Sequence, residues 1–259
     1  MSNACLIFDD LTLGYNKNAA VQNLTGTVDK GSLIAVVGGN GSGKSTLMKG
    51  VSGLLTPISG ACIVDASVRV AYLPQRSELD NTFPARVLDL LTLGLWPRRG
   101  LLGRYTSEDR KVVGNALSSV GLDGFENVSI DALSGGQLQR ALFARVIIQN
   151  ADLILLDEPF NAVDEQTICD LLALIEGWHQ EGRTIMVVIH DLQLVRDHFP
   201  EALLLANYPV AWGDAKKTLS LKNLRQAREY SLSMPGTGAV AQSQRAYARH
   251  SAGKMNTVQ

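Results

Sequence analysis

The chain has 259 residues, 46% of them hydrophobic, and its 24 basic and 25 acidic side chains leave a formal net charge of −1. This composition excludes a disordered chain. The balanced charge gives no electrostatic reason to expect nucleic acid as a partner, because proteins that bind the phosphate backbone usually carry a basic face. No signal peptide is expected, and no apolar run approaches the ~18–20 residues that span a bilayer.

The three cysteines, Cys5, Cys62 and Cys169, are odd in number and lack the spacing of metal ligands. We expect them to be small core residues of a protein that works in a reducing compartment.

The residue pattern in the first part of the chain predicts several short strands followed by a buried strand. Short strands are expected at residues 5–8, 11–15 and 24–28, because turn-forming Asp, Asn and Gly residues separate them. The continuous apolar run at 33–37 is typical of a strand that is buried on both faces of a parallel sheet. A helix is expected over residues 45–51.

A glycine-rich loop links that buried strand to the helix, and it fits the phosphate-loop pattern G-x-x-x-x-G-K-[ST]. Its backbone N–H groups can converge on phosphate oxygens, and the helix dipole favours the same anion. Lys44 can reach the β- and γ-phosphates, the Ser45 hydroxyl suits Mg²⁺, and Thr46 can donate to a phosphate oxygen. The alternative is a glycine-rich turn followed by a surface lysine. The residues expected around the phosphates are Gly38, Gly39, Asn40, Gly41, Ser42, Gly43, Lys44, Ser45 and Thr46.

Strands are next expected at residues 61–64 and 68–73, after which helical periodicity sets in between residues 75 and 150. This stretch contains the pentapeptide Leu-Ser-Gly-Gly-Gln at residues 133–137. On its own, the pentapeptide is also typical of a helix start with Ser134 as the N-cap.

The apolar strand expected at 153–157 ends in Asp157 and Glu158. A buried carboxylate is costly unless it is paired, so we expect Asp157 to support a Mg²⁺ ion and Glu158 to activate water. An acidic pair that caps a helix is the alternative. Pro159 ends the strand and exposes both carboxylates at the carboxyl edge of the sheet, where ligands bind in open α/β folds.

The remaining chain predicts two more strands, at 184–189 and 202–205, and a helix capped by Asp164. Another helix is expected at 219–229. Residues 231–259 are rich in Ser, Gly, Ala and Gln, and we expect them to be mobile.

The phosphate loop, the pentapeptide and the acidic strand end, in this order, resemble the ATP-binding cassette (ABC) ATPases over about residues 4–214. The resemblance implies an α/β fold: a P-loop NTPase (RecA-like) core with an N-terminal antiparallel β-subdomain and an inserted α-helical subdomain. It implies an ATPase domain at 1–214, with the helical subdomain at about 76–151, and a partly mobile C-terminal extension at 215–259.

The same resemblance implies roles for further residues, with ATP and Mg²⁺ as cofactors. Tyr15 is placed to stack on adenine, although a core or edge-strand tyrosine is the alternative. Gln75 matches the Q-loop glutamine that touches Mg²⁺ or the attacking water, so the implied metal ligands are Ser45, Gln75 and Asp157. His190 is placed to contact the γ-phosphate and, with Glu158, to act in catalysis. Residues 161–164 resemble the D-loop.

In this family, two cassettes meet head to tail, and the signature pentapeptide of one copy closes over the nucleotide of the other. The residues of this chain that would do so are Ser134, Gly135, Gly136 and Gln137. A symmetric homodimer is therefore expected.

Residues 72–80, 83–84, 87–89 and 157–164 are similar to the branch that imports zinc, manganese and related divalent metals. This similarity implies two partners, an integral membrane permease contacted by residues 76–104 and, indirectly, an extracytoplasmic metal-binding protein. The chain would then lie peripherally on the cytoplasmic face of the inner membrane. The alternatives are an iron-chelate or haem importer, an efflux system, a soluble ABC ATPase that remodels ribosomes or DNA, and a regulatory nucleotide-binding module. One departure from the family is Gly39, which stands where a proline is common.

Overall fold

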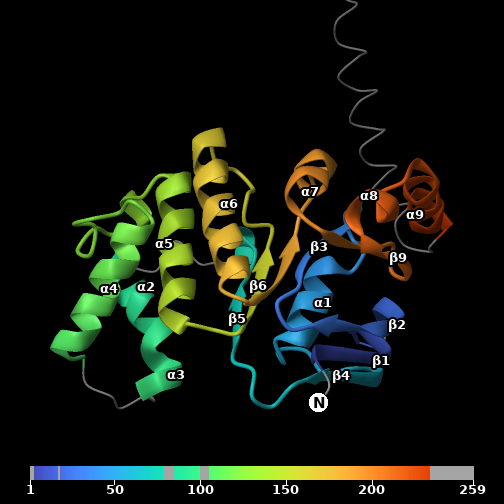
Figure 1. Ribbon diagram of the computed structural model, residues 1–259, viewed down its shortest axis with the longest axis horizontal. Helices are drawn as coiled ribbons and strands as arrows, with labels where there is room; N and C mark the ends of the chain where they lie inside the picture. Colours follow the sequence, from blue (N-terminus) through green and yellow to red (C-terminus); the bar gives the residue numbers. More distant parts are fainter. Residues whose placement is uncertain (1–2, 17, 79–84, 100–104, 234–259) are drawn as a thin grey trace, which may run out of the picture.

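Figure 1 shows the computed structural model, which describes residues 3–16, 18–78, 85–99 and 105–233. Two sheets and a group of helices make up the described part of the chain. In Figure 1 the antiparallel sheet lies at the lower right, the larger sheet crosses the centre, and helices α2 to α5 lie on the left.

The smaller sheet is antiparallel and has the strand order β2-β1-β4. Its strands are β1 (Ala4–Tyr15), β2 (Asn18–Asp29) and β4 (Ser59–Val64). The two strands predicted at 5–8 and 11–15 form one continuous strand. Between them Asp10 adopts a left-handed φ of 43°, and the register shifts between Phe8 and Leu11. A bulge of this kind absorbs the turn-forming residues without ending the strand. β2 also begins earlier than the predicted residue 24.

The larger sheet has the order β5-β6-β7-β3-β8-β9. Its strands are β3 (Leu33–Gly38), β5 (Val70–Leu73), β6 (Leu153–Asp157), β7 (Thr184–Val188), β8 (Glu201–Leu205) and β9 (Pro209–Asp214). All neighbours pair in parallel except β9, which pairs antiparallel with β8 and was not predicted. The carboxyl ends of β3 and β6 therefore lie at one edge of the sheet, on either side of β7.

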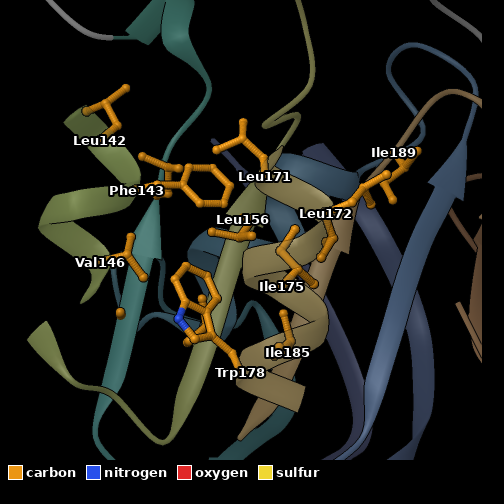
Figure 2. Packing of buried hydrophobic residues seen from close by; sticks show 14 of the residues in the cluster. Leu142, Phe143, Val146, Leu156, Leu171, Leu172, Ile175, Trp178, Ile185 and Ile189 are labelled. Atoms are coloured by element: carbon orange, nitrogen blue, oxygen red, sulfur yellow. The ribbon is translucent and has the colours of Figure 1, made fainter. Parts of the chain in front are cut away.

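Alternate residues of the central strands face two separate cores. Ile34, Val36 and Leu155 pack with the antiparallel sheet and with α1 (Lys44–Val51). Leu156 and Ile185 face the opposite side, where α5 (Gly135–Gln149) and α6 (Glu165–Gln180) cover the sheet. Figure 2 shows this second core, in which Phe143 and Trp178 stack with ring centroids 5.7 Å apart. The rigid sheet thus carries the loops at its carboxyl edge.

The helices between β5 and β6 are α2 (Val87–Thr92), α3 (Trp96–Arg99), α4 (Ser107–Ser119) and α5. Short 3₁₀ turns lie at Arg76–Glu78, Leu93–Leu95 and Ile130–Ala132. After β7 come α7 (Leu192–His198), α8 (Ala215–Thr218) and α9 (Leu221–Ser233). None of the helices in the described ranges has the length and apolar character needed to cross a bilayer.

Two expectations need correction. The cysteines are not all core residues, because Cys5 is buried while Cys169 lies exposed on α6. The helix expected at 219–229 continues to Ser233, so the start of the segment expected to be mobile, at 231, is helical. The remainder of that segment lies outside the described residues.

Candidate nucleotide-binding site

The phosphate loop follows β3 and leads into α1, as predicted. Gly38 cannot carry a side chain, because a Cβ there would lie 2.2 Å from the Leu205 carbonyl oxygen. Gly43 has a φ of 97° and forms the N-cap of α1, so the first free N–H groups of the helix open toward the loop. Close packing and left-handed backbone therefore explain the two glycines, and the helix start offers an anion site.

Lys44 is only 5% exposed, and its ammonium donates to the carbonyl oxygens of Gly38 (3.0 Å) and Gly39 (2.8 Å). Burial lowers the pKa of Lys44, whereas the nearby carboxylates of Glu158 and Asp157 oppose that shift. The side chain is thus a buried cation held beneath the loop.

A cavity of about 860 Å³ opens above this loop. It brings together most of the residues predicted for ATP, including Lys44, Gln75, Glu158 and His190. Tyr15, which is 48% exposed, lies on its wall at the end of β1, the central strand of the antiparallel sheet, so it is neither a core nor an edge-strand residue, and its ring can stack on a base. The full lining is Tyr15, Ala20, Asn40, Gly41, Ser42, Gly43, Lys44, Ser45, Thr46, Gln75, Glu158, Asn161 and His190.

Glu158 stands at the centre of a polar cluster at the end of β6. Its carboxylate accepts a hydrogen bond from Gln75 Nε2 at 2.6 Å and another from Asn161 Nδ2, and it lies 2.6 Å from His190 Nε2. Its backbone has a left-handed φ of 52°, which is costly for a residue with a side chain. Such strain persists only where the surroundings fix it, and it is frequent at functional sites.

Asp157, one residue earlier, is 1% exposed and does not line the cavity, so the expectation that both carboxylates are exposed holds only for the cavity-lining Glu158. The Tyr72 hydroxyl lies 3.5 Å from Asp157 Oδ2. The metal ligands expected from the sequence, Ser45, Gln75 and Asp157, offer hydroxyl, amide and carboxylate oxygens. Hard oxygen ligands of this kind fit Mg²⁺. Because Gln75 donates through Nε2, its Oε1 is the atom that can ligate.

The signature pentapeptide does not line this cavity in the same chain. Ser134 is the N-cap of α5, where its Oγ accepts from the Gln137 backbone (3.2 Å) and its own N–H donates to Gln137 Oε1 (2.9 Å). This capping box is the helix start that the pentapeptide alone predicts. Gly38 and Gly39 are also absent from the lining of this cavity and instead line a second, more apolar one beside α9.

Two polar residues at or near the cavity were not among the candidate site residues. Asn161 donates a hydrogen bond to the Glu158 carboxylate. In the sequence, only its position in the D-loop-like segment pointed to a role at the site. Asn207, between β8 and β9, donates through Nδ2 to the carbonyl oxygens of Ala20 (2.8 Å) and Gly41 (3.1 Å). Its backbone N–H also donates to Ser42 O at 3.0 Å. Asn207 therefore ties the phosphate loop to β2, and no motif in the sequence indicates it.

Removing the Asn207 side chain should weaken ATP binding by about 5–150-fold, because two hydrogen bonds worth roughly 0.5–1.5 kcal/mol each tie the loop to β2. Asn207→Gly tests the side chain alone, since glycine tolerates the native φ of 63°. Titration with a fluorescent ATP analogue measures the change. Asn115→Ala, at an exposed position of α4, serves as the control, because alanine removes an asparagine side chain there without placing glycine inside a helix. Equal affinities in wild type and Asn207→Gly would contradict the role.

Comparisons with known proteins agree with this geometry. Residues 21–161 match the family described as "ABC transporter". The chain is 37% identical to the manganese transport system ATP-binding protein MntB of Bacillus subtilis (strain 168) over 84% of this chain and 90% of that protein. It is 39% identical to the zinc transport system ATP-binding protein TroB of Treponema pallidum (strain Nichols), over 79% of each chain.

Among solved structures, an inward-facing metal-chelate type ABC transporter is 29% identical, with a TM-score of 0.79 over 88% of this chain and 90% of that chain. A dimeric cassette bound to ADP and phosphate is 23% identical, with a TM-score of 0.72 over 81% of this chain and 98% of that one. These likenesses confirm the predicted α/β P-loop NTPase fold. With a family match over more than half of its length and relatives above 30% identity, the chain belongs to the ABC transporter family, as a cassette of its ATP-binding subunits.

Proposed function

We propose that the chain hydrolyses ATP with Mg²⁺ and thereby powers import of a divalent metal ion, zinc or manganese, through a separate permease. The observation that carries the ATPase part is the Glu158 cluster at the mouth of the phosphate-loop cavity. The relatives named for manganese and zinc transport support the metal. The domain division expected from the sequence, with the ATPase at 1–214 and an extension at 215–259, is part of the proposal.

In this mechanism, the phosphate loop and Lys44 hold the triphosphate, and Tyr15 stacks on the base. Bound Mg²⁺ would be held by Ser45, Gln75 and Asp157, and it would neutralise charge on the phosphates. Glu158 accepts the proton of the attacking water, while His190 and Gln75 orient the Glu158 carboxylate from either side. His190 also lines the cavity, from which it would contact the γ-phosphate.

The signature residues complete the site in a head-to-tail pair of two copies. The α5 N-terminus, from Ser134 to Gln137, would close over the nucleotide that the other copy holds. This arrangement accounts for the absence of these residues from the lining of the described cavity. Once hydrolysis adds charge repulsion between the products, the pair can open.

Metal specificity is tested in a deletion strain grown with chelators of different metals, together with uptake of radioactive zinc and manganese. Loss of uptake of either metal, restored by the wild-type gene, supports the proposal. The similarity to a metal-chelate type transporter favours a second candidate, import of a metal chelate. Normal zinc and manganese uptake with lost chelate uptake would select that candidate instead.

The permease contact is proposed within residues 76–104, and part of that segment lies outside the described residues. Two apolar side chains in its described part are exposed, Leu93 (42%) and Trp96 (51%). Of the two, Trp96 is the stronger candidate, because tryptophan is enriched among the residues that carry most of the binding energy of an interface.

Trp96→Glu should weaken binding of this protein to membranes at least about 30-fold, because an interface hot spot is worth roughly 2 kcal/mol or more. ATP turnover of the free protein should stay within about twofold. Ile63→Glu is the matched control, since Ile63 is equally exposed (52%) but lies on β4. Sedimentation with membranes measures both variants, and equal retention of the two would argue against this contact.

A further inference from the structure

Arg76 directly follows Gln75 and opens the 3₁₀ turn Arg76–Glu78. The two neighbours face different parts of the chain. Gln75 donates to Glu158 in the phosphate-loop cavity. The Arg76 guanidinium instead lies against the signature pentapeptide, because a Cβ built on Gly135 would meet Arg76 Nη1 at 2.8 Å. Arg76 itself does not line the cavity.

The two signature glycines are packed by their own chain. A Cβ on Gly135 would also lie 3.1 Å from the Ala162 carbonyl oxygen, and a Cβ on Gly136 would lie 3.2 Å from Asp164 Oδ2. A side chain at Gly135 would therefore displace the guanidinium. The small residue there lets a cation approach the start of α5 closely.

The electrostatics of this surface are mixed. The N-terminus of α5 carries a partial positive charge, which favours an anion. Hydrogen bonds from the Thr167 backbone and hydroxyl hold the pKa of Asp164 below its usual range, so a full negative charge lies beside Gly136. That carboxylate would repel an approaching phosphate. The guanidinium of Arg76, beside the adjacent glycine, offsets it.

We propose that Arg76 is part of the half-site that receives the triphosphate bound by a second copy, and that its guanidinium supplies positive charge there. This inference rests on the head-to-tail pair of the proposed function. It assigns to Arg76 a contact with the partner's nucleotide, separate from the ATP cavity of its own chain. Glu158 thus acts on the nucleotide bound by its own copy, whereas Arg76 contacts the nucleotide bound by the other copy. Gln75, which directly precedes Arg76, contacts Glu158.

The test uses the full chain with Glu158→Gln, so that ATP is bound without being consumed. Light scattering gives the ATP concentration at which half of the protein is dimeric. Adding Arg76→Met should raise that concentration at least about tenfold, because it removes a charged hydrogen-bond donor from the phosphate of the other copy. Arg76→Gln should behave alike, and Arg76→Lys, which keeps the charge, should restore most of the effect. Arg110→Met, on the exposed face of α4, is the control and should change nothing.

A second measurement separates this role from a structural one. Binding of a fluorescent ATP analogue at protein concentrations too low for dimerisation should stay within about twofold in Arg76→Met. Unchanged dimerisation in Arg76→Met and Arg76→Gln, or an equal loss of monomer affinity, would overturn the inference. If Glu158→Gln with Arg76 intact fails to dimerise with ATP, the head-to-tail pair itself is refuted.

Discussion

Glu158→Gln should lower ATP turnover by about 10²–10⁴-fold, the usual contribution of a general base, while ATP still binds. The amide keeps the size of the carboxylate and can still contact Gln75, Asn161 and His190, but it cannot accept the proton of the attacking water. ATP that is bound and not hydrolysed should then hold two copies together. We expect a stable ATP-dependent dimer in size-exclusion chromatography with negligible phosphate release.

Glu165→Gln provides the matched control. Glu165 is exposed in the first turn of α6, a few residues beyond Glu158, and its substitution by glutamine removes the same charge. Its turnover should stay within about twofold of wild type, because surface substitutions of this kind rarely change stability by more than about 0.5 kcal/mol. A Glu158→Gln variant that hydrolyses ATP at the normal rate would remove Glu158 from its role.

The central part of the fold could be predicted from local patterns. β3, β6 and β7 are continuous apolar runs, as expected for strands buried on both faces of a parallel sheet. The phosphate loop between β3 and α1 was equally clear, since its glycines and Lys44 occur at a fixed spacing. Both signals depend on residues that are close together in the sequence, so these elements can be predicted without knowing the tertiary contacts.

The edges of the two sheets were harder to predict. β9 begins at a proline and mixes polar with apolar residues, which is tolerated because it is an edge strand that pairs only with β8. The first residues of β2 are similarly mixed, and their pairing with the end of β1 makes them a strand. In both cases the partner strand decides the conformation, and local propensity does not reveal it.

Within the site, the sequence identified residue types but not their mutual geometry. Glu158 combines a left-handed backbone with side-chain contacts to Gln75 and His190, which are distant from it in the chain. The approach of Arg76 to Gly135 and the role of Asn207 likewise join segments far apart in sequence. Long-range contacts of this kind leave no local pattern, so the structure was needed to find them.

Lys44→Met should raise the Kd for ATP about 100-fold, because it removes a charged hydrogen-bond donor worth roughly 1.5–3 kcal/mol from the phosphate site. Among the described residues that line the cavity, Lys44 is the one lysine or arginine. Methionine keeps most of the length and the apolar stem. Isothermal titration with ATP measures the effect, and Lys111→Met, on the exposed surface of α4, serves as the control.

The same substitution should not destabilise the protein, and this separates lost binding from lost folding. Burial lowers the pKa of Lys44 in the folded chain, so the folded state binds this proton more weakly than the unfolded state does. The charged lysine therefore costs stability at neutral pH, and the cost disappears as pH rises through the lowered pKa toward 10.5. Without nucleotide, Lys44→Met should melt no lower than wild type at pH 7, and any advantage should shrink in alkaline buffer. A variant that melts lower than wild type at pH 7 would show instead that the hydrogen bonds from Lys44 to Gly38 and Gly39 outweigh the cost of burying its charge.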